Sequence, residues 1–537
     1  MKVVDFFCGG GGFSEGFRQA GFDIVFAVDK WEPAIITYKG NKPGVNAVLD
    51  DVIRISNLPD DQFEALVPDS EVIIGSPPCQ SFSHSNKSGN ADKSIGIKLI
   101  KAYLKIIARK KYKKNSILKY WVLENVPSVK EYIEDEYTAE DLGLEGSFVL
   151  RPHGGNSGKY NAKYYGAPTN RQRYLCGEFP PLQRTNEDNN VKTLGDVLKA
   201  LGDPLSPIPN EVTDLNYPTL VLPKSQVTDH QYIYELAPFE WKTAERLKRD
   251  KGYMGKMSFP ENLEKPARTV MATMSASSRE AMILEHKEGK YRLPTVREAA
   301  SMMSFPIDYW FYGKTKSIKH TLVGNAVPPK LSYAIALKEG ESIPEQYPPI
   351  QHDEEIAFVN LNGNIFPKKK EKERRSTAKF KYHIPYLIQA EYRVELTNYH
   401  SDFGDEHRPP SFKWDAEIHY SQGKDKARVY TPDLSLNEID ENLQLAIKEF
   451  ICQKCRNLPS YNDFQVRYCM TTTERKEANV MGPYELLDEV KAFIVRTIPE
   501  QHFENQICLN EVPHPLPLAI AVGYIILNQI THEMGGK

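Results

Sequence analysis

Cysteine is scarce in this chain, with 7 among 537 residues and no regular spacing between them. This scarcity excludes a disulfide-stapled scaffold and, with no secretory signal before Val3, leads us to expect a reducing, cytoplasmic setting. The formal net charge is only −3, which excludes a polycation that binds nucleic acid through its overall field. The longest apolar run, Leu516 to Leu527, contains Pro517 and Gly523 and is too short to cross a bilayer, so we expect no membrane partner.

The first chemically informative segment spans residues 75–83, which read Gly-Ser-Pro-Pro-Cys-Gln-Ser-Phe-Ser. It follows the β-branched run Val72 to Ile74, which predicts a buried strand. Two consecutive prolines stiffen the loop before Cys79, because each fixes φ and removes a backbone donor. A thiolate held there would be a strong nucleophile. The alternative is a buried cysteine in a proline-containing turn.

The second informative segment is the beginning of the chain, where a predicted strand over residues 1–7 runs into four consecutive glycines. Such a turn between strand and helix permits positive φ and a close approach of a ligand to the backbone. A second predicted strand, residues 24–28, ends at Asp29, where a ribose hydroxyl pair could bind. Asp51 could accept from an exocyclic amine, or could simply cap a helix. Together these features predict an adenosine-type cofactor at the carboxyl ends of parallel strands.

Six blocks in this order make the chain resemble the cytosine-5 DNA methyltransferases over residues 1–338. They are Asp5–Gly12, Gly75–Gln80, Glu124–Val126, Arg171–Arg173, Arg297–Ala300 with Phe305-Pro306, and Gly324–Pro329. The resemblance implies S-adenosyl-L-methionine as cofactor and double-stranded DNA as substrate. Two positions depart from the family pattern, which has glutamine where this chain has Thr169 and Leu322. We expect different local hydrogen bonding there but retained activity.

The resemblance also assigns roles to individual residues. Cys79 would attack carbon 6 of cytosine, and Glu124, with a raised pKa, would protonate N3. Arg171 or Arg173 would donate to the cytosine O2 and lower the thiol pKa, or one of them would hold Glu124 or a phosphate. The base that finally removes the C5 proton is left open. The residues predicted to bind the cofactor are Phe7, Gly9, Gly11, Gly12, Asp29, Trp31, Asp51, Pro77 and Asn325.

This chemistry requires the target base to leave the duplex, at a cost of a few kcal/mol. Residues 81–98, rich in Ser, Asn, Lys and Gly, are predicted to be a lid that closes over the extruded base, or else an ordinary flexible loop. Residues 180–294 lie where the family has its target-recognition region. The residues predicted to contact DNA are Ser81, Ser83, Lys87, Arg268 and Arg279.

The predicted fold is α/β, a Rossmann-like S-adenosylmethionine-dependent methyltransferase core with an inserted target-recognition region and an appended C-terminal α/β domain. We predict a catalytic domain over residues 1–179 and 295–338, the recognition region over 180–294, a linker over 339–378, and a C-terminal domain over 379–537. The charged run at 368–375 is interpreted as a solvated tether, with a DNA-contacting arm as alternative. In the last domain we expect a strand at 392–396 and helices near 437–452 and 484–495.

Two patterns in the C-terminal domain contain residue types that occur in metal sites. Cys452 and Cys455 have the spacing of half a zinc site, but no second close pair accompanies them. Asp433, followed by Glu474 and Lys476, has the residue types of a magnesium nuclease at a loose spacing. The default is an accessory role in DNA contact, assembly or partner binding, and we predict no metal ligands.

The leading functional prediction is a DNA cytosine-5 methyltransferase acting on a specific duplex sequence within a restriction–modification system. We expect it to be monomeric on DNA, associated with the nucleoid, and accompanied by a restriction endonuclease of the same specificity. Three alternatives stay open: an RNA (tRNA) cytosine-5 methyltransferase, a methyltransferase fused to a nuclease-like domain, and a catalytically silent DNA-binding module. An intact Cys79, Glu124 and glycine loop argue against the last.

Overall fold

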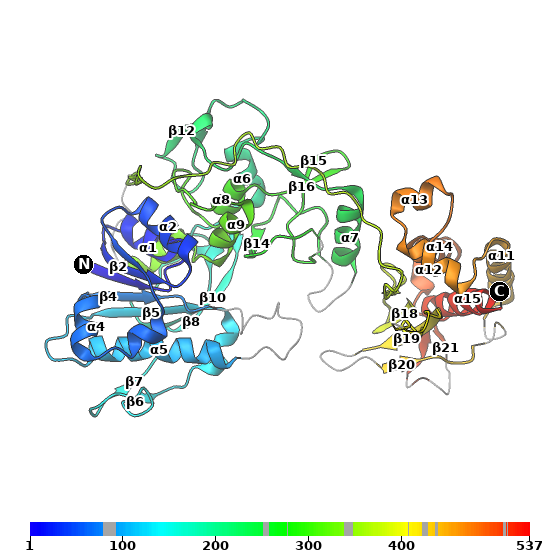
Figure 1. Ribbon diagram of the computed structural model, residues 1–537, viewed down its shortest axis with the longest axis horizontal. Coiled ribbons are helices and arrows are strands. Elements are labelled where there is room, and N and C mark those ends of the chain that lie inside the picture. The colour runs from blue at the N-terminus through cyan, green and yellow to red at the C-terminus, as the bar shows by residue number, and fades with distance from the viewer. Residues whose placement is uncertain are drawn as a thin grey trace. The chain divides into compact units, whose positions relative to one another are not determined.

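The computed structural model describes residues 1–78, 93–250, 257–276, 278–337, 347–405, 407–421, 428–434, 436, 439–507, 512 and 514–536. The chain divides into two compact units (Figure 1). Unit 1 contains Met1–Leu236 and Pro260–Pro367, and unit 2 contains Ala237–Phe259 and Lys368–Lys537. Among the described residues, no helix is long and apolar enough to cross a membrane.

Unit 1 is organised around a seven-stranded sheet of order β3-β2-β1-β4-β5-β10-β8. The first five strands in this order are mutually parallel, and β10 runs antiparallel to both β5 and β8. The strands are β1 (Lys2–Phe6), β2 (Asp23–Asp29), β3 (Asn46–Leu49), β4 (Val72–Gly75), β5 (Tyr120–Asn125), β8 (Gly158–Asn161) and β10 (Gln172–Glu178). The three strands of this unit expected from the sequence are thus confirmed as β1, β2 and β4.

Helices cover both faces of this sheet because successive residues of its strands point to opposite sides. On one face, Val4 and Ile73 pack in the same apolar cluster as Tyr103 of α5 (Ser94–Lys111). On the other face, Val3 packs in a second cluster with Phe13 of α1 (Gly12–Gln19), which lies against α10 (Pro329–Ala336). The doubly wound, mainly parallel core predicted from the sequence is confirmed.

The rest of unit 1 forms a third apolar cluster around α6, α8 and α9. Its elements, with the short strands and helices that complete the unit, are α2 (Glu32–Asn41), α3 (Val52–Ser56), α4 (Asp60–Leu66), η1 (Pro127–Tyr132), β6 (Tyr137–Thr138), β7 (Val149–Leu150), η2 (Ala162–Tyr165), β9 (Thr169–Asn170), α6 (Leu194–Leu201), β11 (Glu211–Thr213), β12 (Val221–Pro223), η3 (Lys224–Gln226), β13 (Tyr234–Glu235), β14 (Ala267–Arg268), β15 (Leu284–Lys287), β16 (Lys290–Leu293), α8 (Val296–Met302) and α9 (Lys316–Asn325).

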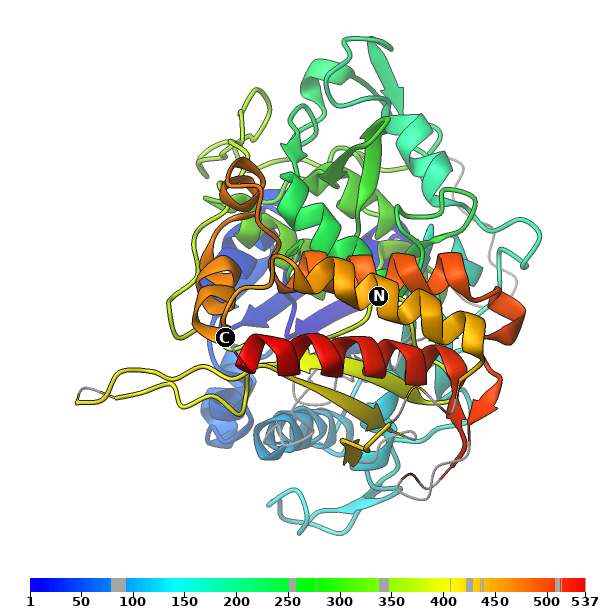
Figure 2. The same cartoon turned by 90° about the vertical axis from the view of Figure 1, so that its right-hand side faces the viewer.

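Unit 2 combines a four-stranded antiparallel sheet, β17-β18-β19-β20, with helices. Figure 2 shows the long terminal helix α15 running alongside this sheet, and its side chains share one apolar core with those of β18 and β19. The elements are α7 (Pro238–Arg249), β17 (Lys381–His383), β18 (Tyr392–Thr397), β19 (Asp415–Tyr420), β20 (Arg428–Tyr430), α11 (Glu441–Cys455), α12 (Tyr461–Cys469), α13 (Thr472–Glu477), α14 (Pro483–Thr497), η5 (Glu500–His502), β21 (Gln506–Ile507), β22 (Leu516–Pro517) and α15 (Leu518–Gly535). The predicted strand at 392–396 and both predicted helices are confirmed as β18, α11 and α14.

The structure divides the chain differently from the predicted boundaries in two places. Residues 237–259, predicted as recognition region, belong to unit 2, where the guanidinium of Arg246 in α7 lies over the rings of Tyr382 and Tyr484. Residues 347–367, predicted as linker, belong to unit 1: the Tyr347 hydroxyl donates to Asp308 at 3.0 Å. A local charge and proline pattern could not reveal either contact, because both partners lie far away in the sequence.

Candidate active site

A cavity of about 540 Å³ opens at the carboxyl ends of the parallel strands of unit 1. This is where α/β sheets of this kind bind ligands, and the volume is within the usual range for small-molecule sites. The lining includes predicted cofactor residues and the predicted acid with both arginines: Phe7, Gly9, Gly12, Asp29, Trp31, Asp51, Pro77, Asn325, Glu124, Arg171 and Arg173. It therefore brings together residues that are up to 318 positions apart in the chain, from Phe7 to Asn325.

Left-handed backbone angles and a hydrogen bond to the end of β2 define the conformation of the glycine loop. Phe7, Gly9 and Gly11 have φ values of 54°, 51° and 85°, in the left-handed region that favours glycine. The Gly9 N–H donates to Asp29 Oδ2 at 2.9 Å, which joins the loop to the end of β2. Gly11 lies outside the cavity lining: a Cβ there would come within 2.7 Å of the Tyr309 hydroxyl. Gly11 is thus required for packing behind the loop, a role that the sequence did not indicate.

The Gly324–Pro329 block packs directly beside this loop. A Cβ on Gly12 would lie 2.5 Å from the Val327 carbonyl oxygen and 3.1 Å from Ala326 Cβ. One helix turn further, the Ser332 hydroxyl of α10 donates to the Gly12 carbonyl at 3.3 Å. The two segments can meet only because residue 12 is glycine, and Asn325 of the same block lines the cavity.

Two acids lie where a nucleoside could be recognised. Asp29 accepts from the N–H groups of Trp31 and Gly9, both at 2.9 Å; burial raises its pKa, and these bonds oppose the rise. Asp51 accepts from the Ile53 N–H at 2.7 Å as the N-cap of α3, and it also lines the cavity. The capping interpretation of Asp51 is therefore correct, and it leaves the second carboxylate oxygen of this residue available.

Glu124 stands at the end of β5 and faces Arg173 of β10. Its Oε1 lies 2.9 Å from Arg173 Nε, and the two side chains are 8% and 9% exposed. Burial raises the pKa of Glu124, while the guanidinium groups of Arg173 and Arg171 oppose the rise. A raised pKa favours the protonated form of the carboxyl group, which is the form that a general acid requires.

The two arginines have different surroundings. Arg173 holds Glu124 and donates to the Gln172 carbonyl at 2.7 Å. Arg171 donates to three backbone carbonyls, those of Val270 at 3.1 Å and of Gly324 and Ala326 at 3.0 Å each. Arg171 thus joins β10 to the segment after β14 and to the end of α9.

Asn125 is a positioning residue that sequence reasoning did not single out, although it belongs to the Glu124–Val126 block. Its side-chain amide donates to the Pro77 carbonyl at 2.9 Å, and its Oδ1 accepts from the Val126 N–H at 2.8 Å. Asn125 therefore fixes the proline pair that precedes Cys79. Cys79 itself, with Ser81, Ser83 and Lys87 and most of the predicted lid, lies outside the described residues.

A family model described as C-5 cytosine-specific DNA methylase matches residues 1–340. The chain belongs to this family. It is 28% identical to the type II methyltransferase M.MthTI of Methanothermobacter thermautotrophicus, over 63% of this chain and 96% of the relative. It is 31% identical to M.MJ0563P of Methanocaldococcus jannaschii, named as a candidate type II methyltransferase, over 63% and 98%. The solved S. pombe Dnmt2 methyltransferase covers 63% of this chain and 97% of its own at 20% identity, with a TM-score of 0.39.

The two departures from the family pattern have local explanations in this DNA methylase. The Thr169 hydroxyl is placed to bond to the carbonyls of Ala267 and Arg268, at 3.3 and 3.2 Å, beside the parallel pair β9–β14. Leu322 lines the cavity, and its Cδ2 would lie 3.5 Å from a Cβ on Gly10. The Thr169 hydroxyl thus joins two strands, and the expected difference from the family's hydrogen bonding stays a prediction.

The predicted DNA contacts within the described residues are engaged inside the methylase. Arg268 forms an ion pair with Glu261, with Nε 2.9 Å from Oε2, and donates to the Ala281 carbonyl at 3.0 Å. Arg279 is half-buried. The contacts of Arg268 join it to Glu261 and Ala281, so its side chain helps to hold residues 261–281 together.

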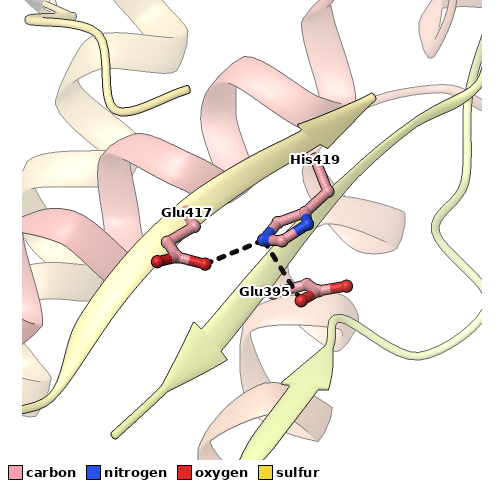
Figure 3. A group of neighbouring side chains, drawn as sticks. All are labelled: Glu395, Glu417 and His419. Carbon is pink, nitrogen blue, oxygen red and sulfur yellow. Dashed lines mark hydrogen bonds and ion pairs between the residues drawn. The ribbon is translucent and has the colours of Figure 1, made fainter. Parts of the chain in front are cut away.

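Among the described residues, neither C-terminal pattern belongs to a group of three or more side chains that could share a metal ion. Cys452 and Cys455 lie in the last turns of α11, and Glu474 accepts from Thr471 in the capping box of α13. Within the part of the chain that the structure describes, one group of three or more His, Cys, Asp or Glu side chains could share an ion: Glu395, Glu417 and His419 (Figure 3).

That group lies on the polar side of β18 and β19 and is already compensated in charge. His419 Nε2 lies 2.8 Å from Glu417 and 3.2 Å from Glu395. Lys381 Nζ lies 3.0 Å from Glu417, and Arg393 Nε lies 2.6 Å from Glu395. Two cations therefore neutralise the two carboxylates, and the arrangement is that of a buried ion-pair network.

Proposed function

We propose that this DNA methylase transfers a methyl group from S-adenosyl-L-methionine to carbon 5 of a cytosine extruded from a specific duplex sequence, with Cys79 as nucleophile. One observation carries the assignment of roles: the buried Glu124–Arg173 pair and the glycine loop line the same cavity. A proton donor for the base and a binding site for a nucleoside cofactor are therefore adjacent.

The residues of the cavity fit a nucleoside cofactor. Gly9 and Gly12 leave the loop backbone open, Asp29 and Asp51 offer carboxylate oxygens to hydroxyl or amine donors, and Trp31 offers an aromatic face. Asn325 would form part of the wall of the cofactor site. When bound, S-adenosyl-L-methionine would supply the electrophilic methyl group.

The chain's own residues would activate the cytosine. The Cys79 thiolate forms a bond to carbon 6, and the displaced π-electron pair moves towards N3. Glu124 gives its proton to N3 as that charge develops, while Arg173 keeps the carboxyl group in position. After methyl transfer, a base takes the C5 proton and the C5–H electron pair re-forms the C5–C6 double bond as the thiolate leaves; N3 returns its proton to Glu124, and the aromatic ring is restored. Arg171 acts as a positioning residue, since its guanidinium holds three backbone carbonyls.

The relatives named as type II methyltransferases support a place in a restriction–modification system, with an endonuclease that cuts the same unmethylated sequence. The target cytosine must leave the helix because its ring is otherwise stacked and paired. The described part of the recognition region would read the flanking bases, with Arg279 and the segment around Ser275 as the contacts to test.

The proposal is tested with the full-length protein, labelled S-adenosyl-L-methionine, and three substrates: duplex DNA, the same strand single-stranded, and tRNA. We expect transfer to duplex DNA, located by bisulfite sequencing. Cys79→Ser should abolish transfer while cofactor affinity changes less than about twofold, and the matched control Cys452→Ser, an exposed cysteine of unit 2, should behave as wild type. A trapped 5-fluorocytosine adduct that maps to another residue, or full activity of Cys79→Ser, would refute the assigned nucleophile.

A further inference from the structure

A second cavity of unit 1, of about 260 Å³, is separate from the methyl-transfer site. It is bounded by the end of η2, by residues 183–186 and 192, and by α10. The lining is Tyr165, Gly166, Gln183, Arg184, Thr185, Asn186, Lys192, Asn216, Lys330, Tyr333, Ala334 and Leu337. Three of these side chains are cations, and no acidic residue is found among the described residues of the wall.

Lys330 is the most unusual of the three cations. Its Nζ lies over the Tyr217 ring, 4.1 Å from the centroid, and 5.6 Å from that of Tyr333. Across the described ranges, no carboxylate lies within ion-pair distance of it. Burial lowers the pKa of Lys330 to about 8, and the positive charge of Lys192 adds to this effect. Lys330 is half-buried, and a lysine in such surroundings ordinarily has an acidic partner, which the described residues do not provide.

Lys192 brings a second positive charge to the same wall. Its Nζ donates to the Leu215 carbonyl at 3.1 Å and to Asn216 Oδ1 at 3.2 Å, both of which are neutral. The nearest acid is Asp214, which is 2% exposed and does not line the cavity. Backbone N–H groups already occupy that carboxylate, with those of Asn216 at 2.6 Å and Ile307 at 2.7 Å.

The remaining wall suits a tetrahedral oxyanion. Arg184 stacks over the Tyr164 ring at 4.5 Å, which fixes a planar donor at the mouth. Its nearest carboxylate, Glu187, is 3.8 Å away and 69% exposed, so this pair is weak. Gln183, Thr185 and Asn186 add neutral hydrogen-bonding groups.

We propose that this cavity binds a phosphate group, held between Lys192, Lys330 and Arg184. Arginine and lysine are the side chains that proteins use for this anion, and charge-assisted bonds to phosphate are among the stronger polar contacts. The phosphate can belong to a free nucleotide or to a nucleic-acid backbone, and the test separates these sources.

The experiment is calorimetric titration of the full-length protein with inorganic phosphate, adenosine monophosphate and a short DNA duplex. Wild type should bind at least one probe saturably. Lys330→Met and Lys192→Met should each weaken that binding about tenfold or more, because each removes a charge-assisted bond. The matched control Lys199→Met, an exposed lysine on α6, should change it less than about twofold. Lys330→Gln, with unchanged circular dichroism, separates loss of charge from loss of folding.

The probes distinguish the sources of the phosphate. If phosphate or the nucleotide binds, the cavity is a small-molecule site. If only the duplex binds, the cavity contacts the DNA backbone. Equal affinities of wild type and both lysine variants, or no saturable binding of any probe, would overturn the proposal.

Discussion

Replacing Arg173 by methionine is the sharpest test of the acid assigned to this site. The change removes the guanidinium that lies 2.9 Å from Glu124 and leaves a buried carboxylate without that cation. The pKa of Glu124, already raised by burial, should then rise further, since the attraction that opposes burial is lost. We expect lower turnover, because the proton donor loses its orientation, together with a stability loss that depends on pH.

The magnitude follows from the burial of both partners. Breaking a buried ion pair on one side costs about 3–5 kcal/mol, because an uncompensated charge is left in the interior. A carboxyl group whose folded-state pKa is raised contributes stability at low pH and loses it as pH rises through that pKa. The deficit of Arg173→Met should therefore be small near pH 5 and largest near pH 8. The double variant Glu124→Gln/Arg173→Met has no buried charge at this position and should recover most of the stability but none of the activity.

The assay must resolve unit 1, because a chain with two compact units need not unfold in one transition. Hydrogen exchange of β5 and β10 peptides at the two pH values gives the local opening free energy. Arg151→Met is the matched control, since its pair with Glu136 at 2.8 Å is 65% and 54% exposed and should matter by less than about 1 kcal/mol. If the double variant were as unstable as the sum of the single variants, or the deficit did not change with pH, the buried-pair argument would fail.

Further predictions concern residues that do not line the cavity themselves but contact the segments that do. Burial raises the pKa of Asp5 to about 7, so wild type should lose about 2.5 kcal/mol more stability than Asp5→Asn between pH 5 and pH 8 in urea unfolding; parallel curves would contradict this. Asn125→Ala removes the bond to the Pro77 carbonyl and should lower single-turnover methylation about tenfold with little change in cofactor affinity. Tyr309→Phe removes the bond to the Gly10 carbonyl and should raise the KM for the cofactor about fivefold, leaving kcat nearly unchanged. Equal effects on kcat and KM would exclude a role confined to the glycine loop.

Local sequence patterns predicted much of the cavity because its chemistry is concentrated at strand ends. Three strands, the glycine loop, Asp29 and Glu124 are each recognisable from a few consecutive residues. The pairing of Glu124 with Arg173, rather than with Arg171, was not predictable, because it depends on the antiparallel register of β10 beside β5. The same holds for Gly11, whose neighbour Tyr309 is 298 positions away, from Gly11 to Tyr309.

Polar residues were harder to interpret than apolar ones. Arg268 is a plausible DNA contact by residue type, but its charge is used by Glu261 seven positions earlier. Glu474 has the residue type of a metal ligand, yet it caps a helix. In both cases the side chain pairs with a polar group nearby in the chain. A single sequence does not show which polar groups pair with one another in the fold.

The division of the chain into units bears on how the C-terminal part was joined to the methylase. A domain attached by a simple tether would be connected to it once. Here the chain passes between the units three times, at residues 236–237, 259–260 and 367–368. The excursion carries α7, whose Arg246 lies over two aromatic rings of unit 2 and whose following residue, Asp250, accepts from the Tyr386 N–H at 2.7 Å. Removal of residues 368–537 would therefore uncover the side of α7 that packs against Tyr382 and Tyr484, so unit 2 is not attached as a simple appendage.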